Sequence, residues 1–145
     1  MMISTKGRYA LRVMIELANA GEDNLLPLKD IATNQNISEK YLESIIKLLV
    51  QGEMVIGHRG KGGGYKLSKP VPEYTVGSIL KLAEGSLAPV ACLGDKEHAC
   101  DRASGCLTLP LWTELYKLID NYFEGVTLED LVNQVKNVDY KEFEL

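Results

Sequence analysis

Residues 28–67, LKDIATNQNISEKYLESIIKLLVQGEMVIGHRGKGGGYKL, decide the fold. The first part predicts a short helix within residues 25–36, and Ser38 is a good N-cap for another helix that runs to about Gln51. The buried face of the shorter helix comprises Leu28, Ile31 and Ala32. Two short helices separated by a few residues indicate a helix-turn-helix unit, although such pairs are also common in proteins that bind no DNA.

The helix that follows Ser38 has two different faces. Its apolar positions recur every three or four residues, at Leu42, Ile45, Ile46 and Leu49. The opposite face carries Glu39, Lys40, Glu43, Ser44 and Lys47. Because the second helix of a helix-turn-helix unit can enter the major groove of DNA, this polar face is the candidate recognition surface.

A basic hairpin follows this helix directly. Residues 54–58 are β-prone, residues 59–64 (RGKGGG) form a turn-rich tip, and residues 65–67 return as a second strand. The glycines suit a turn that requires positive φ, and their spacing matches neither a phosphate-binding loop nor a dinucleotide-binding loop. A helix-turn-helix followed by such a hairpin is the layout of a winged helix, whose hairpin can touch the DNA backbone or the minor groove.

Helical patterns also flank this unit. We expect a first helix over about residues 4–19, ended by Gly21, and a further helix over about residues 75–84, ended by Gly85. The predicted fold class is therefore mainly α, with a small β-hairpin wing and a long helix toward the C-terminus.

That long helix is expected over about residues 110–124. Its apolar positions are Leu111, Trp112, Leu115, Leu118, Ile119, Tyr122 and Phe123. A chain of 145 residues offers little else to bury so wide a stripe, so it favours a homodimer seam over an internal contact. Thr127 and Asp130 resemble a capping box for a last short helix, and the acidic tail, residues 138–145, is expected to fray.

The charge is divided unevenly along the chain. Residues 1–70 carry ten Lys and Arg against seven Asp and Glu, whereas residues 71–145 carry six against thirteen. A basic front half suits double-stranded DNA as the partner, although its excess of three positive charges is small and the whole chain carries a net charge of -4. With no signal peptide and no apolar run long enough for a membrane, the expected compartment is the cytoplasm.

All three cysteines, Cys92, Cys100 and Cys106, fall in an expected irregular loop over residues 86–108. Thiolates favour soft metals, so an iron–sulfur cluster and zinc are the candidates for the group that these cysteines bind. The spacing is wider than that of the usual zinc knuckle, which favours the cluster. A metal-free or redox-active thiol loop is the remaining alternative.

Several blocks of the chain together resemble the Rrf family of bacterial winged-helix transcription regulators, and most closely its iron–sulfur cluster regulators. The blocks are STKGRYA (4–10), IS (37–38), YLE (41–43), RG (59–60), GGGY (62–65), the three cysteines, and LW (111–112). The resemblance runs from residue 1 to about residue 135. It implies a DNA-binding domain over residues 1–70, with the cluster loop and the dimerisation helix within residues 71–145.

The resemblance also implies roles for single residues. The position of Arg59 reads a base in the minor groove, and the position of Glu43 tunes which sequences are accepted, because a carboxylate can accept from cytosine but repels phosphate. Lys40 and Ser44 depart from the pattern of the cluster regulators, so the operator is expected to differ. The full set of expected DNA-binding residues is Lys6, Arg8, Tyr9, Ser38, Lys40, Tyr41, Glu43, Ser44, Lys47, Arg59 and Lys61.

At the cluster, the departure is larger. The cluster regulators place a histidine three residues after the last cysteine, where this chain has Leu109, and the position from which some relatives supply a partner ligand is Arg8. The local candidates for a fourth ligand are His98, which we prefer, and Glu97, Asp95 and Asp101. The gap leaves the cluster type open between 2Fe–2S, which is favoured, and 4Fe–4S.

The expected function is a transcription regulator, mainly a repressor, controlled by a cluster and acting on iron–sulfur assembly, redox or sulfur-metabolism genes. The alternative is a metal-free repressor of cysteine or sulfur metabolism that a protein partner controls. We expect neither an enzyme nor a small-molecule substrate, because the sequence shows no catalytic constellation of Ser, His and Asp or of paired carboxylates.

Overall fold

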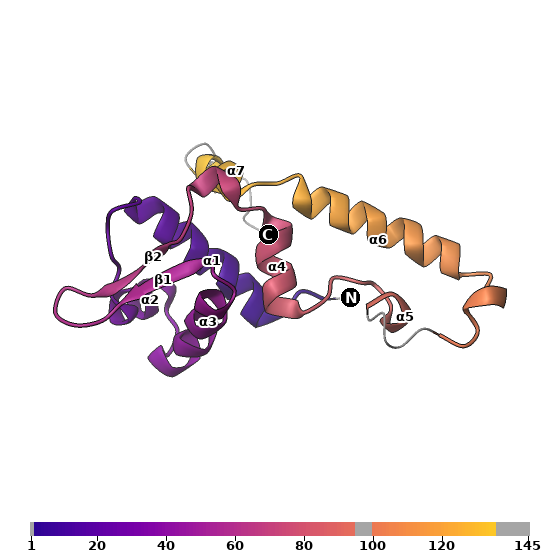
Figure 1. Cartoon of the computed structure of the whole chain (residues 1–145), viewed down its shortest axis with the longest axis horizontal. Helices are drawn as coiled ribbons and strands as arrows, with labels where there is room; N and C mark the ends of the chain where they lie inside the picture. Colours follow the sequence, from indigo (N-terminus) through magenta and orange to yellow (C-terminus); the bar gives the residue numbers. More distant parts are fainter. Residues whose placement is uncertain (1, 95–99, 136–145) are drawn as a thin grey trace, which may run out of the picture.

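The computed structural model describes residues 2–94 and 100–135 (Figure 1). The helices are α1 (Thr5–Ala20), α2 (Leu28–Gln35), α3 (Glu39–Gln51), α4 (Val76–Glu84), α5 (Ala91–Gly94), α6 (Leu109–Glu124) and α7 (Leu128–Val135). The strands are β1 (Val55–His58) and β2 (Gly64–Leu67), and short 3-10 turns lie at Val71–Glu73 and Ala103–Gly105. The expectation of a mainly helical fold with a small hairpin is confirmed.

Side-chain caps fix where several of the helices begin. The Ser38 hydroxyl accepts the Tyr41 backbone N–H at 3.1 Å, which confirms the predicted start of α3. Thr75, expected as the first residue of α4, is instead its N-cap. The capping box predicted before α7 is present in both directions, because Thr127 N–H donates to Asp130 and Asp130 N–H donates to the Thr127 hydroxyl.

β1 and β2 pair in antiparallel register from Val55 with Leu67 to His58 with Gly64, and we call residues 55–67 the wing. The tip glycines Gly60 and Gly62 have φ of 96° and 77°, the left-handed region that glycine adopts without strain. On its outer edge β2 also pairs with Leu26, through two backbone hydrogen bonds between Leu26 and Tyr65.

The main core joins α1, α2, α3 and the wing, and it extends past residue 70. Tyr74, two residues of α4 (Ile79 and Ala83) and Leu128 at the start of α7 are buried in the same cluster. The helix-turn-helix and the wing are therefore completed by α4 and α7, and the three parts form one packed body.

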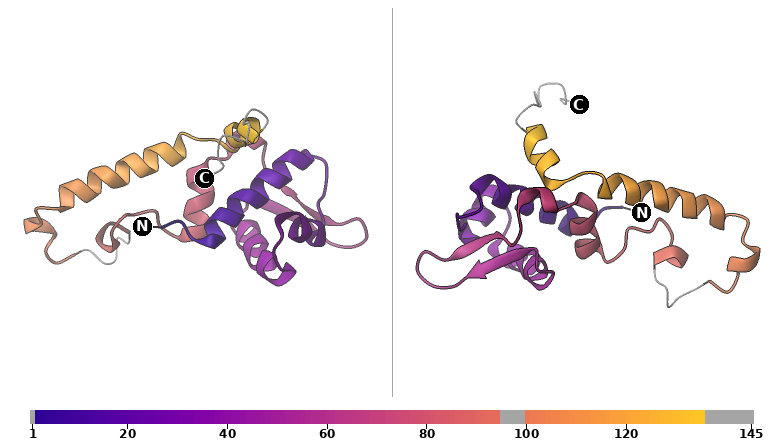
Figure 2. Two further views of the ribbon diagram at one scale, coloured as in Figure 1. Left: turned by 180° about the vertical axis from the view of Figure 1, so that it is seen from behind. Right: turned by 45° about the horizontal axis from the view of Figure 1, so that its top comes forward.

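Figures 1 and 2 show α6 running outward beyond this body, so the molecule is elongated. One side of α6 packs against α4, in a cluster of Val76, Leu80, Leu87, Tyr116, Ile119 and Phe123. The apolar side chains of Leu111, Leu118 and Tyr122 are 61%, 68% and 69% exposed. No residue of α6 is fully buried within this chain, so much of the apolar stripe identified in the sequence has no cover here.

The loop between α4 and α6 differs in part from the expectation of an irregular segment. Among its described residues, α5 and the 3-10 turn at Ala103–Gly105 are short helical pieces. Asp95, Glu97, His98 and the tail from residue 138 lie outside the described residues. Within residues 2–94 and 100–135, no helix is both long and apolar enough to cross a membrane.

Candidate DNA-binding surface and cysteine loop

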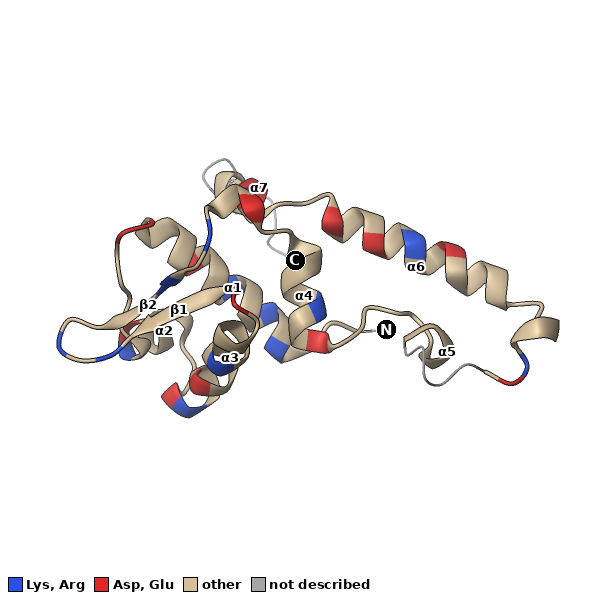
Figure 3. Cartoon of the chain, in the orientation of Figure 1, with Lys and Arg blue, Asp and Glu red and all other residues tan. Residues whose placement is uncertain are grey.

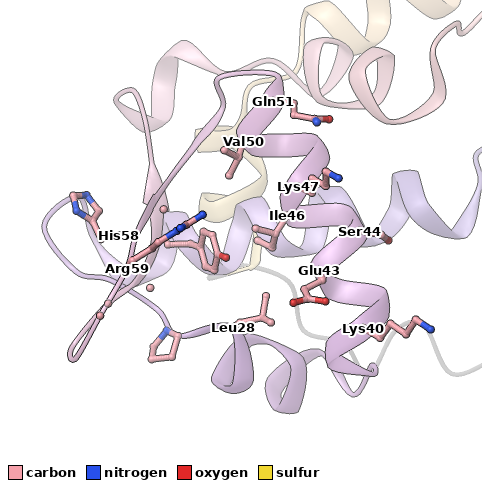
Figure 4. Close-up of a pocket in the computed structure, with 16 residues that line it drawn as sticks. Leu28, Lys40, Glu43, Ser44, Ile46, Lys47, Val50, Gln51, His58 and Arg59 are labelled. Atoms are coloured by element: carbon pink, nitrogen blue, oxygen red, sulfur yellow. The ribbon is translucent and has the colours of Figure 1, made fainter.

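An open groove of about 960 Å³ lies between α3 and the wing (Figure 4). Five of the expected DNA-binding residues line it, four from α3 and one from the wing: Lys40, Glu43, Ser44, Lys47 and Arg59. All five are exposed. The structure thus brings the predicted recognition face and the predicted wing contact to one surface, and it adds Gln51 and His58, which the sequence pattern did not single out.

Within the groove, one carboxylate faces a mainly basic surface. Figure 4 shows Glu43 directed into the groove from α3 and Arg59 directed into it from the wing. Figure 3 shows basic residues at the tip of the wing and mainly acidic residues along α6. Lys61, two residues after Arg59, is exposed as well. Cations suit phosphates, and a single carboxylate among them can accept a hydrogen bond from a cytosine amino group.

At the start of α1, the expected residues divide into two kinds. Lys6 and Arg8 are exposed, and Arg8 donates to the Thr5 hydroxyl at 3.1 Å. Tyr9 is half-buried in edge-to-face contact with Tyr41 of α3, with ring centres 5.9 Å apart. The Arg12 guanidinium, which the sequence pattern did not single out, lies 4.7 Å from the Tyr9 ring centre. The two tyrosines therefore fasten α1 to α3, as well as lying near the basic surface.

The N-terminus of α1 is held by a carboxylate from the far end of α4. Glu84 accepts hydrogen bonds from the Ser4 backbone N–H at 2.9 Å and from the Ser4 hydroxyl at 2.7 Å. A Cβ at Gly7 would collide with the Glu84 carboxylate, so only glycine allows this approach. The end of α4, which leads into the cysteine loop, is thereby tied to the helix that presents Lys6 and Arg8.

A charged cluster joins α4 to α6. Lys81 of α4 binds Asp120 at 2.5 Å and Glu124 at 2.8 Å, and Glu124 also accepts from the Thr75 hydroxyl at 2.8 Å. Hydrogen bonding to Asp120 and Glu124 raises the pKa of Lys81 to about 12, and bonding to Lys81 and then Thr75 lowers the pKa of Glu124. This cluster and the apolar contact beside it set the angle between α6 and the body.

The three cysteines are free thiols along one loop. Cys92 and Cys106 are half-buried, and Cys100 is exposed. A hydrogen bond from the Thr108 hydroxyl, 3.4 Å from the Cys106 sulfur, lowers the pKa of the Cys106 thiol. In the part of the chain that is described, no three His, Cys, Asp or Glu side chains form a group that could hold a metal ion.

Family comparison agrees with this arrangement. Residues 3–134 match the family model of Rrf2, described as an iron-dependent transcriptional regulator. The HTH-type transcriptional regulator IscR of Yersinia pseudotuberculosis is 35% identical over 133 residues, which are 92% of this chain and 80% of that protein.

Solved structures of two regulators have similar folds. CymR, described as the global cysteine regulator of B. subtilis, is 37% identical with a TM-score of 0.75, over 92% of this chain and 98% of that one. The T. potens IscR structure is 28% identical with a TM-score of 0.75, over 99% of this chain and 97% of that one. The fold is therefore shared with these transcription regulators.

Proposed function

This chain belongs to the Rrf2 family of transcriptional regulators, and from that premise we propose that it is a repressor whose operator binding is controlled by an iron–sulfur cluster. The observation that carries the proposal is the groove in which Lys40, Glu43, Ser44 and Lys47 of α3 meet Arg59 of the wing. Relatives in this family are transcription regulators and not enzymes. The proposed targets are genes of iron–sulfur assembly, redox or sulfur metabolism.

In the proposed complex, residues 1–70 read double-stranded DNA. The polar face of α3 enters the major groove, where Glu43 accepts from a cytosine amino group, and Arg59 enters the neighbouring minor groove. The proposed phosphate contacts are Lys6, Arg8, Lys40, Lys47, Lys61 and Lys66. Affinity is then expected to fall steeply with salt, because each phosphate contact releases counterions.

We propose a homodimer whose seam is α6. The exposed side chains of Leu111, Leu115, Leu118 and Tyr122 form an apolar stripe along this helix. A second copy of the chain carries the same stripe, and two such faces can cover each other. Two copies would also present two copies of α3, as a pair of DNA half-sites requires.

Cys92, Cys100 and Cys106 would hold the cluster, and their donor chemistry fits it, because three free thiols on one loop are the ligand type that iron–sulfur clusters take. When bound, the cluster would supply a redox-sensitive inorganic centre held by these three thiolates. Leu109 offers no donor, so we propose His98 as the fourth ligand, with Glu97, Asp95 and Asp101 as the other candidates, and 2Fe–2S is favoured over 4Fe–4S.

Control of DNA binding then follows from where the loop is attached. The loop leaves α4 directly after Glu84, which holds the start of α1, and it returns into α6 at Leu109. Ordering the loop therefore bears on both the basic start of α1 and the proposed dimer seam. A shift between two loop states can change affinity without any contact between the cluster and DNA.

The test is to purify the full chain without oxygen, record its visible spectrum, and measure iron and sulfide. DNA binding is then measured by fluorescence anisotropy, with a labelled duplex that the protein has enriched from a random-sequence library. We expect a brown protein whose colour is lost in Cys92→Ser and Cys106→Ser, and kept in Ser104→Ala, a control in the same loop. A colourless, zinc-free protein that binds the duplex equally well before and after oxygen exposure would refute cluster control.

A second candidate function rests on the similarity to CymR. It is a metal-free repressor of cysteine or sulfur metabolism that a protein partner controls. The same purification separates the two, because this alternative requires DNA binding by a colourless protein and no change in Cys92→Ser. The cluster remains the preferred proposal, since all three cysteines of the chain lie within residues 92–106.

A further inference from the structure

Tyr74 is a buried tyrosine with an unusually well-bonded hydroxyl. Only 2% of the residue is exposed, and its hydroxyl accepts backbone N–H groups from Ser68 at 3.0 Å and Lys69 at 2.9 Å. The same hydroxyl donates to the Met54 carbonyl at 2.8 Å. A buried polar group with three such bonds holds its partners in a fixed arrangement.

These partners are the two legs of the wing. Met54 immediately precedes β1, and Ser68 and Lys69 immediately follow β2. The legs also bond to each other, from Ser68 N–H to the Met54 carbonyl at 3.2 Å, and Met54 N–H bonds the Leu49 carbonyl of α3 at 2.9 Å. The Tyr74 hydroxyl bonds both legs at once. The Tyr74 side chain therefore links both legs of the wing to the body, beside the Met54 bond to α3 and the buried side chains of Val55 and Leu67.

Farther out, the wing has one more backbone support, the paired hydrogen bonds between Leu26 and Tyr65. Beyond it the tip projects into open space, with no atom within 4 Å of a Cβ built at Gly60 or Gly62. A hairpin held at a mid-point and at its root has a defined direction. If the root is released, the hairpin can rock about the mid-point, and Arg59 at the tip moves with it.

The backbone around Tyr74 is bonded to the segment between α6 and α7. Its carbonyl accepts the Leu128 N–H at 2.9 Å, and Val76 N–H donates to the Val126 carbonyl at 2.8 Å. These two bonds pair the segment that follows the wing with the segment that leaves α6. The root of the wing is thus fixed relative to α6 as well as to the core.

We propose that Tyr74 is a positioning residue for DNA recognition, whose hydroxyl aims the wing so that Arg59 reaches its base. This inference rests on the proposed function, because it assumes that the wing contacts DNA. Tyr74 touches no DNA itself and acts through the wing.

The test is a double-mutant cycle in the full chain with Tyr74→Phe and Arg59→Ala, using the enriched duplex described above. In the parent protein, Arg59→Ala is expected to weaken binding by roughly 5- to 150-fold. Tyr74→Phe alone is expected to weaken it by about tenfold, and in that background Arg59→Ala should cost only about twofold more, because the guanidinium is already misplaced.

Val13→Ala is the control, since it removes buried volume from α1 and leaves the hydrogen bonds of the Tyr74 hydroxyl in place. It should lower thermal stability as Tyr74→Phe does, while Arg59→Ala keeps its full effect in that background. Amide hydrogen exchange in the DNA-free protein gives a second measurement, in which residues 55–67 should exchange faster in Tyr74→Phe than in Val13→Ala.

Additive effects of Tyr74→Phe and Arg59→Ala, or equal exchange of the wing in both variants, would overturn the inference. If the parent protein enriches no duplex, the proposed function fails instead. In that case the exchange of residues 55–67 alone decides whether Tyr74 fixes the wing.

Discussion

Gly7→Ala is expected to destabilise this protein, and the same substitution is expected to become slightly stabilising once Glu84 has been removed. In the parent chain, the new methyl group would occupy the position of the Glu84 carboxylate. The carboxylate would have to turn away and lose its hydrogen bonds to the N–H and hydroxyl of Ser4. The remaining close neighbour is the Cγ2 methyl group of Ile3 at 3.2 Å, which needs to shift by only a few tenths of an ångström.

The size of the effect follows from these contacts. Hydrogen bonds to a charged group contribute about 1.5–3 kcal/mol each when buried, and this half-buried pair is expected to contribute about 2 kcal/mol in total. Replacing glycine by alanine inside a helix returns about 0.5–1 kcal/mol. Gly7→Ala should therefore cost about 1–1.5 kcal/mol in the parent, and should gain about 0.5 kcal/mol in a Glu84→Ala background.

The assay is urea unfolding followed by circular dichroism, at one protein concentration for all variants. Glu22→Ala, which removes an exposed carboxylate from a turn, is the matched control and should lie within about 0.5 kcal/mol of the parent. The free-energy cost of Gly7→Ala is compared with and without Glu84. If the two values agree to within about 0.5 kcal/mol, the hydrogen bonds from Ser4 to Glu84 do not hold α4 to α1.

Three further outcomes are expected. Arg59→Ala should weaken binding to the enriched duplex by about 1–3 kcal/mol in fluorescence anisotropy, and unchanged affinity would refute the wing assignment. Leu118→Glu should leave the helical circular dichroism intact but give a monomer in sedimentation velocity, because this side chain is exposed within one chain. Glu124 has a lowered pKa, so its stabilising effect is present above its ordinary pKa of 4.5 and is lost as the pH falls through the lower folded-state value. The Lys81→Met variant should therefore lose less stability than the parent on acidification. An equal loss in urea unfolding would contradict a stabilising role for the charged cluster between α4 and α6.

The parts of the fold that were predictable are those that depend on near neighbours in sequence. Ser38 begins α3, and Thr127 caps α7 together with Asp130, because each side chain bonds a backbone group three residues away. The α5 turn was missed, since four residues are too few to show a helical period.

The hydrogen bonds made by Glu84 and by the Tyr74 hydroxyl were not predictable, because the bonded residues are distant in sequence. Glu84 meets Ser4 eighty positions away, and the Tyr74 hydroxyl meets Met54 twenty positions away. In the sequence, Glu84 is an ordinary acidic residue at a helix end and Tyr74 an ordinary aromatic residue after a proline-containing linker. The extension of the core past residue 70, to Leu128, has the same cause.

The site divides in the same way. Lys40, Glu43 and Lys47 were predictable because one face of a helix can be read from its spacing, and Arg59 because it flanks a glycine turn. That these faces meet in a groove required the packing of the wing against α3. Arg12 was missed because its role is a contact with an aromatic ring, which no local pattern reports.

The two ends of α4 also bear on how this chain tolerates change. At one end Tyr74 and Leu128 are paired through the backbone, and at the other Glu84 holds Ser4, so the body is closed without help from the exposed stretch at residues 100–105. An inserted residue or a single protease cut within residues 100–105 should therefore leave the body folded. After such a cut, the two fragments should stay associated.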